Sequence, residues 1–124
     1  MKYSVLMANY NNSRYIGVAI QSVISQTLVD WELIIIDDNS SDDTETMTRQ
    51  YAAKDQRIKF FKNDINLGII KSRNLALSKC AGEFVAVLDS DDVWTDNTKL
   101  QQQVEFLEKN IKHPVDFKQL FYGI

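Results

Sequence analysis

One stretch of the chain indicates the fold more clearly than any other: Phe84-Val85-Ala86-Val87-Leu88-Asp89-Ser90-Asp91-Asp92. Its five consecutive apolar residues predict a strand that is buried on both faces. Three carboxylates then follow within four positions. Because like charges so close together repel one another and resist desolvation, their placement at a strand end predicts that a cation binds there.

A second segment has the same design, since Leu33-Ile34-Ile35-Ile36 runs into Asp37-Asp38-Asn39-Ser40. Two buried strands that each end in carboxylates predict one acidic cleft at one edge of a sheet, where open α/β sheets bind their ligands. Asp37 and Asp38 are adjacent at the end of the strand, so we expect one of them to face the cleft. There it could accept a hydrogen bond from an N–H group of a ligand.

The bulk properties of the chain narrow the possible functions. Its 124 residues are enough for one domain with a real core. Fourteen basic and seventeen acidic residues give a net charge of −3 without a Lys/Arg block, which argues against nucleic acid as the main partner. The lone Cys80 fits a reducing compartment, and the sequence shows no signal peptide or membrane span. We therefore expect a cytoplasmic domain, or one held at the inner face of the membrane by regions outside this chain.

Strand-like runs recur along the chain at intervals of 25 to 29 residues, the length of one βα unit. They begin near Tyr3, Glu32, Ile58 and Glu83. The intervening segments have helical character, so the sequence predicts an α/β fold with a mostly parallel sheet and helices on both faces. The residues after Pro114 have no clear period and predict either a short strand or a frayed end.

Apolar residues at helical spacing place four helices between these runs. The second begins with Asp42 and Glu45 at the spacing of a capping box and is expected to run to about Asp55. The expected buried faces are Ile16, Ala19, Ile20, Val23 and Ile24 in the first helix, Ile69, Arg73, Ala76, Leu77 and Cys80 in the third (about 69–79), and Leu100, Val104, Leu107 and Ile111 in the fourth.

The D-x-D formed by Asp89 and Asp91 is the first candidate metal site. Alternate residues on an extended chain point the same way, so the two carboxylates are predicted to address one Mg²⁺ or Mn²⁺ ion. The structural alternative is a solvated acidic turn that caps the following helix.

Two further side chains are candidates for ligand binding, each with a structural alternative. Arg73 interrupts an apolar helix face close to the acidic strand ends, where it could bind an anionic ligand or pair with an acid. Tyr10 lies in a polar loop just after the first strand, where its ring could stack on a flat ligand or cover the edge of the core. Gly68 is expected to adopt a positive φ in a tight turn, and Trp94 and Cys80 are expected to pack in the interior.

Five segments, in order, resemble the N-terminal, nucleotide-sugar-binding half of family 2 glycosyltransferases, which have the Rossmann-like GT-A fold. They are SVLMANYN at 4–11, AIQSVISQT at 19–27, WELIIIDDNSSD at 31–42, NLGIIKSRN at 66–74 and GEFVAVLDSDDVW at 82–94. The resemblance implies an inverting transferase that moves a sugar from a nucleotide-sugar, with UDP as the expected nucleotide. The acceptor would be a saccharide or a lipid-linked molecule in cell-surface polysaccharide synthesis.

The resemblance also implies roles for residues that hold the nucleotide. In that family the loop after the first strand and the second acidic residue of the strand-two pair hold the base, usually uracil. This implies base contacts from Tyr10 and Asp38, with Ala8 in close contact. It also places Arg73 near the nucleotide.

The resemblance also implies different roles for the two acids of the D-x-D. Asp89 contacts the ribose and the cation, and Asp91 is the direct ligand of a Mn²⁺ or Mg²⁺ ion that bridges the diphosphate. The chain departs from the family after Pro114, where nothing resembles the region that binds the acceptor and supplies the general base.

The resemblance therefore divides the chain into a nucleotide-sugar-binding subdomain, residues 1–112, and a tail, residues 113–124, that we expect to be a truncated acceptor region. No general base is identified. One alternative is a fragment that binds nucleotide without transferring sugar. Another is a phospho-accepting receiver domain, but such domains place their acids after the first and third strands, whereas here the acids follow the second and fourth.

Overall fold

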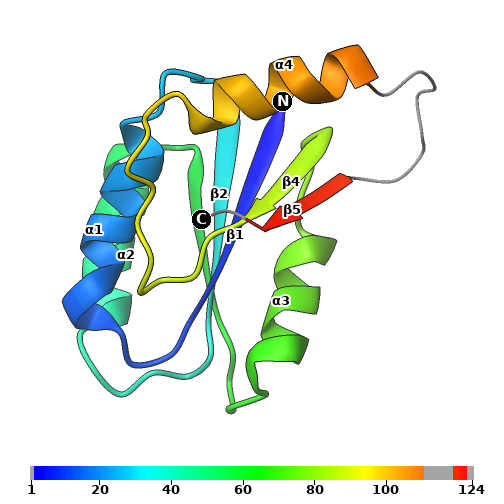
Figure 1. The fold of residues 1–124 in the computed structure, drawn as a ribbon. Coiled ribbons are helices and arrows are strands. Elements are labelled where there is room, and N and C mark those ends of the chain that lie inside the picture. The colour runs from blue at the N-terminus through cyan, green and yellow to red at the C-terminus, as the bar shows by residue number, and fades with distance from the viewer. Residues whose placement is uncertain (1, 111–118, 123–124) are drawn as a thin grey trace.

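Parallel strands and helices alternate along the chain in the computed structural model, which describes residues 2–110 and 119–122 (Figure 1). The strands are β1 (Tyr3–Asn9), β2 (Trp31–Asp37), β3 (Ile58–Lys62), β4 (Phe84–Val87) and β5 (Gln119–Tyr122). The helices are α1 (Ser13–Ile24), α2 (Thr44–Lys54), α3 (Ile69–Ser78) and α4 (Lys99–Asn110). The predicted α/β order is therefore confirmed.

The strands form one sheet in the order β3-β2-β1-β4-β5, and every neighbouring pair is parallel. The chain steps outward from β1 to β3 and then returns to the other side of β1 for β4. This reversal between β1 and β4 is a topological switch point, where loops from neighbouring strands diverge and leave a crevice at the carboxyl ends.

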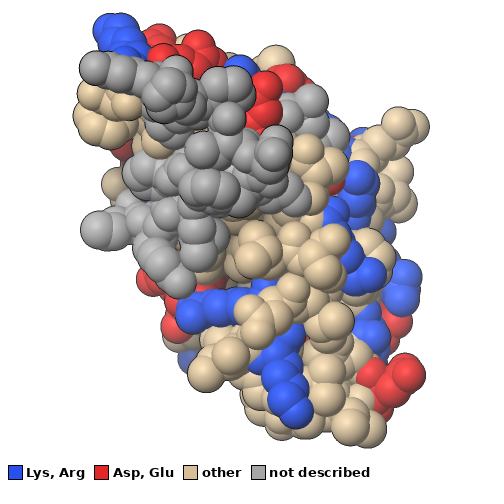
Figure 2. All heavy atoms as spheres, turned by 90° about the vertical axis from the view of Figure 1, so that its right-hand side faces the viewer, with Lys and Arg blue, Asp and Glu red and all other residues tan. Residues whose placement is uncertain are grey.

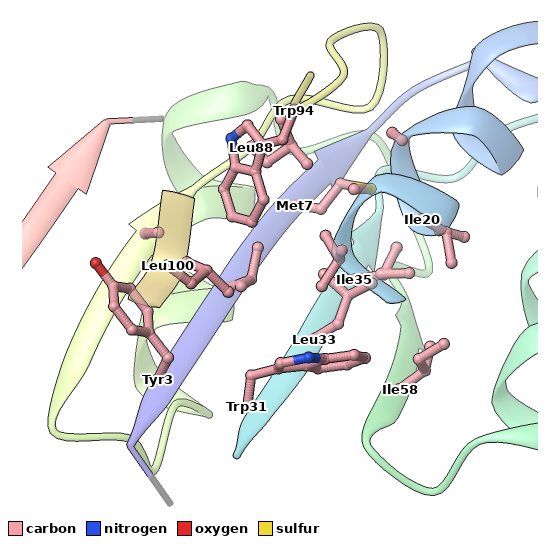
Figure 3. Packing of buried hydrophobic residues seen from close by; sticks show 14 of the residues in the cluster. Tyr3, Met7, Ile20, Trp31, Leu33, Ile35, Ile58, Leu88, Trp94 and Leu100 are labelled. Carbon is pink, nitrogen blue, oxygen red and sulfur yellow. The ribbon is translucent and has the colours of Figure 1, made fainter. Parts of the chain in front are cut away.

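Helices cover both faces of the sheet, as predicted. On one face, α1, α2 and α4 pack against a large apolar cluster that includes Met7, Leu33 and Ile35 from the strands. Figure 3 shows side chains from β1 and β2 meeting Ile20 of α1 and Leu100 of α4 in this layer. On the other face, α3 packs against a smaller cluster that includes Leu6 and Ile34. Successive strand residues alternate between the two clusters, which explains why the strands are apolar throughout.

The apolar stripes predicted for the first and fourth helices are confirmed within the described residues. In α1 and α4, the predicted residues that lie buried are Ile16, Ala19, Ile20, Val23, Leu100, Val104 and Leu107. Ile24 is partly buried. Ile111 and Pro114 lie outside the described residues. Trp94 and Cys80 are also buried, as expected.

The predicted capping box at the start of α2 is wrong. The N-cap residue is Asp43, and its side chain makes no capping hydrogen bond. Asp42 instead accepts hydrogen bonds from the Thr44 hydroxyl (2.6 Å) and from the backbone N–H of Ser13 (2.9 Å). Glu45 forms ion pairs with Arg49 and Lys62. Both side chains that a capping box would have used thus have other partners, some within α2 (Thr44 and Arg49) and some in α1 and β3 (Ser13 and Lys62).

The predicted buried face of α3 is also wrong in part. Ala76 and Cys80 are buried, but Ile69 is 53% exposed and Leu77 is 38% exposed. The helix instead turns Ser72 toward the sheet, where the Ser72 hydroxyl accepts a hydrogen bond from the Asn63 amide (3.1 Å). The side of the helix that faces the sheet thus carries small residues, and the larger apolar side chains stay partly exposed.

The two edge strands of the sheet, β3 and β5, differ in their interactions. The edge strand β3 holds Lys59, which pairs with the buried Glu32 (3.0 Å), and Lys62, which pairs with Glu45 (3.0 Å). On the other side β5 pairs with β4, so the strand alternative for the tail is confirmed over residues 119–122. No helix among residues 2–110 is both long and apolar enough to cross a bilayer.

Candidate functional site

A cavity of about 440 Å³ opens at the carboxyl ends of β1, β2 and β4, at the topological switch point. Its lining residues are Ala8, Asn9, Tyr10, Asn12, Asp38, Asn66, Gly68, Ile69, Ser72, Asp89, Ser90 and Asp91. The structure therefore brings together five of the six predicted site residues. The sixth, Arg73, stands beside the cavity through its contact with Asp89.

Asp37, the first of the paired acids at the end of β2, has a structural role. Asp37 is fully buried and accepts hydrogen bonds from the Asn9 amide (2.9 Å), the Ser40 backbone N–H (2.8 Å) and the Ser40 hydroxyl (2.6 Å). These donors satisfy the buried carboxyl oxygens of Asp37. It is therefore Asp38, the second acid of the pair, that reaches the cavity.

Two asparagines with positive φ shape the loops around this framework. Asn11 has φ 50° and Asn39 has φ 63°, a region that asparagine tolerates better than most residues. The Asn11 side-chain oxygen accepts the backbone N–H of Ser41 (2.9 Å), and the Asn11 N–H donates to the Ser40 hydroxyl (2.8 Å). The loop after β1 is thereby tied to the loop after β2, and Tyr10 is held at the mouth of the cavity.

Asp38 links β2 to the loop that precedes α3. Its Oδ1 accepts hydrogen bonds from the Leu67 N–H (2.7 Å) and the Asn63 amide (3.0 Å), and its Oδ2 accepts one from the Gly68 N–H (2.9 Å). Burial raises the pKa of Asp38, but these hydrogen bonds outweigh it and hold the pKa below its usual value. The Ser72 hydroxyl also lowers this pKa, and the N–H of Gly68 is the hydrogen bond that Oδ2 accepts.

Gly68 makes this arrangement possible. Its φ of 89° confirms the predicted positive φ, and it directly precedes the first residue of α3. In this conformation the N–H groups of both Leu67 and Gly68 reach the same carboxylate. Sequence reasoning identified the turn but not the acid that it binds.

The D-x-D lies on a tight turn, in which the N–H of Asp92 donates to the carbonyl of Asp89 (3.0 Å). The expectation of an extended chain was therefore wrong, although Asp89 and Asp91 do meet. One oxygen from each of Asp89, Asp91 and Asp92 lies within 4.8 Å of the others. The turn thus adds Asp92 to the cluster, in line with the three acids noted at this strand end, although only Asp89 and Asp91 were predicted as metal ligands.

Arg73 reaches the first acid of this turn. Its Nη2 donates to Asp89 Oδ1 at 2.7 Å, and both side chains are about one-third exposed. The structural alternative for Arg73, pairing with an acid, is thus present, and it places a guanidinium at the side of the cavity. Asp91 and Asp92 are exposed, so the negative charge that remains faces solvent at this end of the site.

A hydrogen bond that sequence reasoning missed joins the turn to the opposite wall. The Asn12 amide donates to the Ser90 hydroxyl at 3.0 Å, and Ser90 is 1% exposed. This contact spans 78 positions in the sequence, and Asn12 looks there like any other residue of a polar loop. It fixes the loop that carries Tyr10 relative to the turn that carries the carboxylates.

The chemistry of the cluster fits a hard divalent cation. Carboxylate oxygens are the ligands that Mg²⁺ and Mn²⁺ prefer, and an open position is needed for water or phosphate oxygens. The exposure of Asp91 and Asp92 provides that opening, and Arg73 compensates part of the charge of Asp89. Tyr10 also lines the cavity and is 51% exposed, so its ring is accessible to a ligand.

Comparison with known proteins agrees with this geometry. The family model described as "Glycosyl transferase family 2" matches residues 4–118. The chain belongs to this family. Family 2 membership also excludes the receiver alternative, and the parallel sheet with alternating helices matches solved GT-A glycosyltransferase structures.

Similar family 2 proteins come from several bacteria. The chain is 41% identical over 107 residues to the E. coli UDP-Glc:alpha-D-GlcNAc-diphosphoundecaprenol beta-1,3-glucosyltransferase WfgD, covering 86% of this chain and 41% of that protein. It is also 41% identical over 104 residues to the putative teichuronic acid biosynthesis glycosyltransferase TuaG of Bacillus subtilis, with 84% and 41% covered. The chain thus spans about two-fifths of the length of these relatives.

Solved structures superpose closely on the chain. S. aureus TarS in complex with UDP-GlcNAc matches with a TM-score of 0.82 and 32% identity, over 88% of this chain and 32% of that one. A mannosyltransferase from Pyrobaculum calidifontis, at 23% identity, shares the fold with a TM-score of 0.79, over 86% of this chain and 32% of that one.

The hydrogen bonds to Asp38 predict a pH-dependent contribution to stability. Asp38→Asn should lower the free energy of unfolding at pH 7 by about 1–3 kcal/mol, because the N–H groups of Leu67 and Gly68 lose a charged acceptor. The pKa of Asp38 is depressed, so this contribution is present above the unfolded-state pKa of about 3.9 and is lost as the pH falls through the folded-state pKa. The difference between wild type and variant should therefore shrink below about pH 4.

Urea unfolding followed by tryptophan fluorescence at a series of pH values measures this difference. Asp64→Asn, a change of the same chemistry at an exposed loop position, serves as the matched control and should be neutral at every pH. An Asp38→Asn effect that is equally large at pH 7 and pH 3 would show that the charge of the carboxylate is not its cause.

Proposed function

We propose that this chain binds a nucleoside-diphosphate sugar in the cavity at the switch point and forms the donor-binding part of an inverting glycosyltransferase. One observation carries the proposal. A single cavity combines an exposed aromatic ring (Tyr10), a buried carboxylate (Asp38) and a D-x-D turn (Asp89 to Asp91). A base can stack on the ring and donate to the carboxylate, and a D-x-D turn with a divalent cation suits a ribose and a diphosphate.

UDP is the nucleotide that we assign. The E. coli relative is named for UDP-Glc, and TarS was solved with UDP-GlcNAc. We assign the imide N–H of uracil as a donor to Asp38 Oδ2, beside the N–H of Gly68. We assign Tyr10 to stack on the uracil ring and Ala8, at the end of the buried strand, to close contact with the base.

The diphosphate end is assigned to the D-x-D turn and to Arg73. Asp91 would be the direct ligand of Mn²⁺ or Mg²⁺, and Asp89 would contact the ribose and the ion. A divalent cation bound there supplies charge stabilisation to a nucleoside diphosphate as it leaves the sugar. Arg73 holds Asp89 in place through the 2.7 Å ion pair and adds a positive charge beside the phosphates.

The acceptor that we propose is a saccharide or a lipid-linked molecule of cell-surface polysaccharide synthesis. The E. coli relative is named for a diphosphoundecaprenol-linked acceptor, and the B. subtilis relative for teichuronic acid biosynthesis. Because the chain spans about two-fifths of these proteins, we assign residues 1–112 to donor binding and residues 113–124 to the beginning of the acceptor region.

A second candidate is a chain that binds the donor without transferring the sugar. Every carboxylate that lines the cavity among the described residues is assigned above to the donor or its cation: Asp38, Asp89 and Asp91. None of these three is free to take a proton from an acceptor hydroxyl, which inverting transfer requires. Residues 2–110 thus support donor binding more directly than they support transfer.

The metal assignment predicts that UDP binding depends on a divalent cation. Without one, Asp89 and Asp91 would repel the diphosphate. Isothermal titration calorimetry with UDP should show binding in Mn²⁺ that EDTA weakens. Asp91→Asn should weaken binding about tenfold or more in Mn²⁺ and change it little in EDTA, whereas Asp64→Asn should have no effect in either buffer. Equal affinity of the wild-type chain for UDP in Mn²⁺ and in EDTA would exclude this role for the turn.

The base assignment predicts that Asp38 discriminates between ligands. Loss of a hydrogen bond to a charged group costs about 1.5–3 kcal/mol, so Asp38→Asn should weaken UDP and UMP by that amount. Pyrophosphate, which has no base, should bind the variant and the wild type alike. If UDP, UMP and pyrophosphate all lost affinity equally, Asp38 would act only by holding the loop before α3. The loss of stability predicted above for Asp38→Asn would then explain the loss of binding.

The assignment of the cavity carboxylates predicts binding without efficient turnover. The 124-residue chain should bind UDP-sugars but transfer the sugar poorly or not at all to saccharide or lipid-linked acceptors. Asp116, outside the described residues, is the only acid after Pro114 and is the obvious candidate base to remove. Radiolabelled UDP-sugars with a panel of acceptors measure this directly. Multiple-turnover transfer that survives Asp116→Asn would show that a base lies elsewhere, and failure to bind any nucleotide would contradict the donor site itself.

A further inference from the structure

Asn12 is the N-cap residue of α1, yet its side chain does not cap the helix. Asparagine is among the residues most favoured at this position, because its side-chain oxygen normally accepts an N–H group of the first turn. Here the carboxylate of Asp42, from the loop before α2, accepts the N–H of Ser13 at 2.9 Å. Since another element satisfies part of this helix end, the side chain of Asn12 makes a different contact.

That contact is the hydrogen bond from the Asn12 amide to the Ser90 hydroxyl, at 3.0 Å. Ser90 is the one buried residue of the D-x-D turn, since Asp89 is partly exposed and Asp91 and Asp92 are exposed. Both Asn12 and Ser90 line the cavity. The bond therefore holds the turn at the residue that is not a candidate metal ligand.

The D-x-D turn has to be held in place because its acids repel one another. One carboxylate oxygen from each of Asp89, Asp91 and Asp92 lies within 4.8 Å of the others. Arg73 offsets part of this repulsion through its 2.7 Å ion pair with Asp89. It belongs to α3, on the side of the molecule shown in Figure 2, where Lys and Arg side chains lie among uncharged ones. A cation at the turn would repel this guanidinium, so the ion pair weakens when the site is filled.

The hydrogen bond between Asn12 and Ser90 joins two uncharged groups, so a cation at the turn does not oppose it. The bond also connects the turn to the residue assigned to the base. Asn12 lies two residues after Tyr10 in the loop that follows β1. Asn11, between them, is tied to the loop after β2 by two hydrogen bonds. Because the loop is held from both sides, the position of the turn affects the position of the Tyr10 ring.

We propose that Asn12 is a positioning residue that couples cation binding at the D-x-D turn to nucleobase binding at Tyr10. The proposal rests on the donor-binding function proposed above. A cation orders the three carboxylates, and the ordered turn, through Ser90, holds Asn12 and its loop where the base can stack. Coupling between two sites is reciprocal, so the base should raise the affinity for the cation by the same factor.

Binding of Mn²⁺ to the 124-residue chain, measured by the electron paramagnetic resonance signal of the free ion, tests this coupling. Uridine is the base probe, because it has no phosphate that could bridge to the ion. Saturating uridine should strengthen Mn²⁺ binding to the wild type about fivefold, at the lower end of the usual range for coupled sites. The reciprocal titration of uridine, with and without Mn²⁺, should give the same factor.

Two single variants and their combination remove the hydrogen bond from either side. Asn12→Ser keeps a residue type that is favoured at an N-cap but is too short to reach Ser90. Ser90→Ala removes the acceptor. Each should lower the coupling factor to less than about twofold, and the double variant should lower it no further, because all three lack the same bond.

Two control variants separate positioning from general effects on the fold. Asn74→Ser makes the same chemical change at an exposed position of α3 and should keep the fivefold coupling. Val104→Ala leaves a cavity under α4, where Val104 is 5% exposed, and should lower the melting temperature while keeping the coupling. Circular dichroism establishes that every variant is folded.

The possible results distinguish this proposal from the donor site itself. Wild-type binding of both Mn²⁺ and uridine without coupling would overturn the proposal and leave the donor site standing. Coupling that survives Asn12→Ser or Ser90→Ala would overturn it too. So would a loss of uridine affinity in EDTA for Asn12→Ser but not for Ser90→Ala, which would show that Asn12 contacts the ligand directly. A wild-type chain that binds neither Mn²⁺ nor uridine would overturn the donor site and this proposal with it.

Discussion

Strands that are buried on both faces accept almost no polar side chain along their length, and this constraint organises the rest of the molecule. Polar and charged side chains are confined to the ends of β1, β2 and β4. At the amino end, the buried Glu32 is held by the Ser4 hydroxyl (2.6 Å), the Ala81 N–H (2.6 Å) and Lys59. Burial raises the pKa of Glu32, but these contacts outweigh it and leave the pKa below its usual value. At the carboxyl end, the same confinement gathers the acids that line the cavity.

The acids of the carboxyl end are stabilised in different ways, and the differences separate scaffold from site. Neutral donors of its own loop surround Asp37, backbone N–H groups of a distant loop bind Asp38, and a guanidinium pairs with Asp89. Asp91 remains exposed. Hydrogen-bond donors thus surround the two acids at the end of β2, an ion pair holds the first acid of the turn after β4, and Asp91 of that turn stays open to solvent.

Sequence reasoning was accurate where neighbouring residues determine the structure and failed where distant polar contacts do. The strands and the stripes of α1 and α4 follow from local periodicity, and the acidic strand ends follow from the parallel order of the sheet. The rotation of α3 could not be read in this way, because the helix buries Ser72, which binds Asn63, and leaves Ile69 and Leu77 partly exposed. The turn geometry of Asp89 and the contact between Asn12 and Ser90 depend on loops that meet only after the sheet has formed.

The position of β3 at one border of the sheet has a consequence for the behaviour of the protein at high concentration. A border strand exposes backbone N–H and C=O groups that can template strand addition by another molecule, the first step toward aggregates. β3 carries Lys59 and Lys62 among its five residues, and both side chains are also engaged in ion pairs with neighbouring elements. An incoming strand would have to desolvate these ammonium groups or break their pairs. The two lysines therefore disfavour the addition of a strand from another molecule at this edge of a strongly apolar sheet.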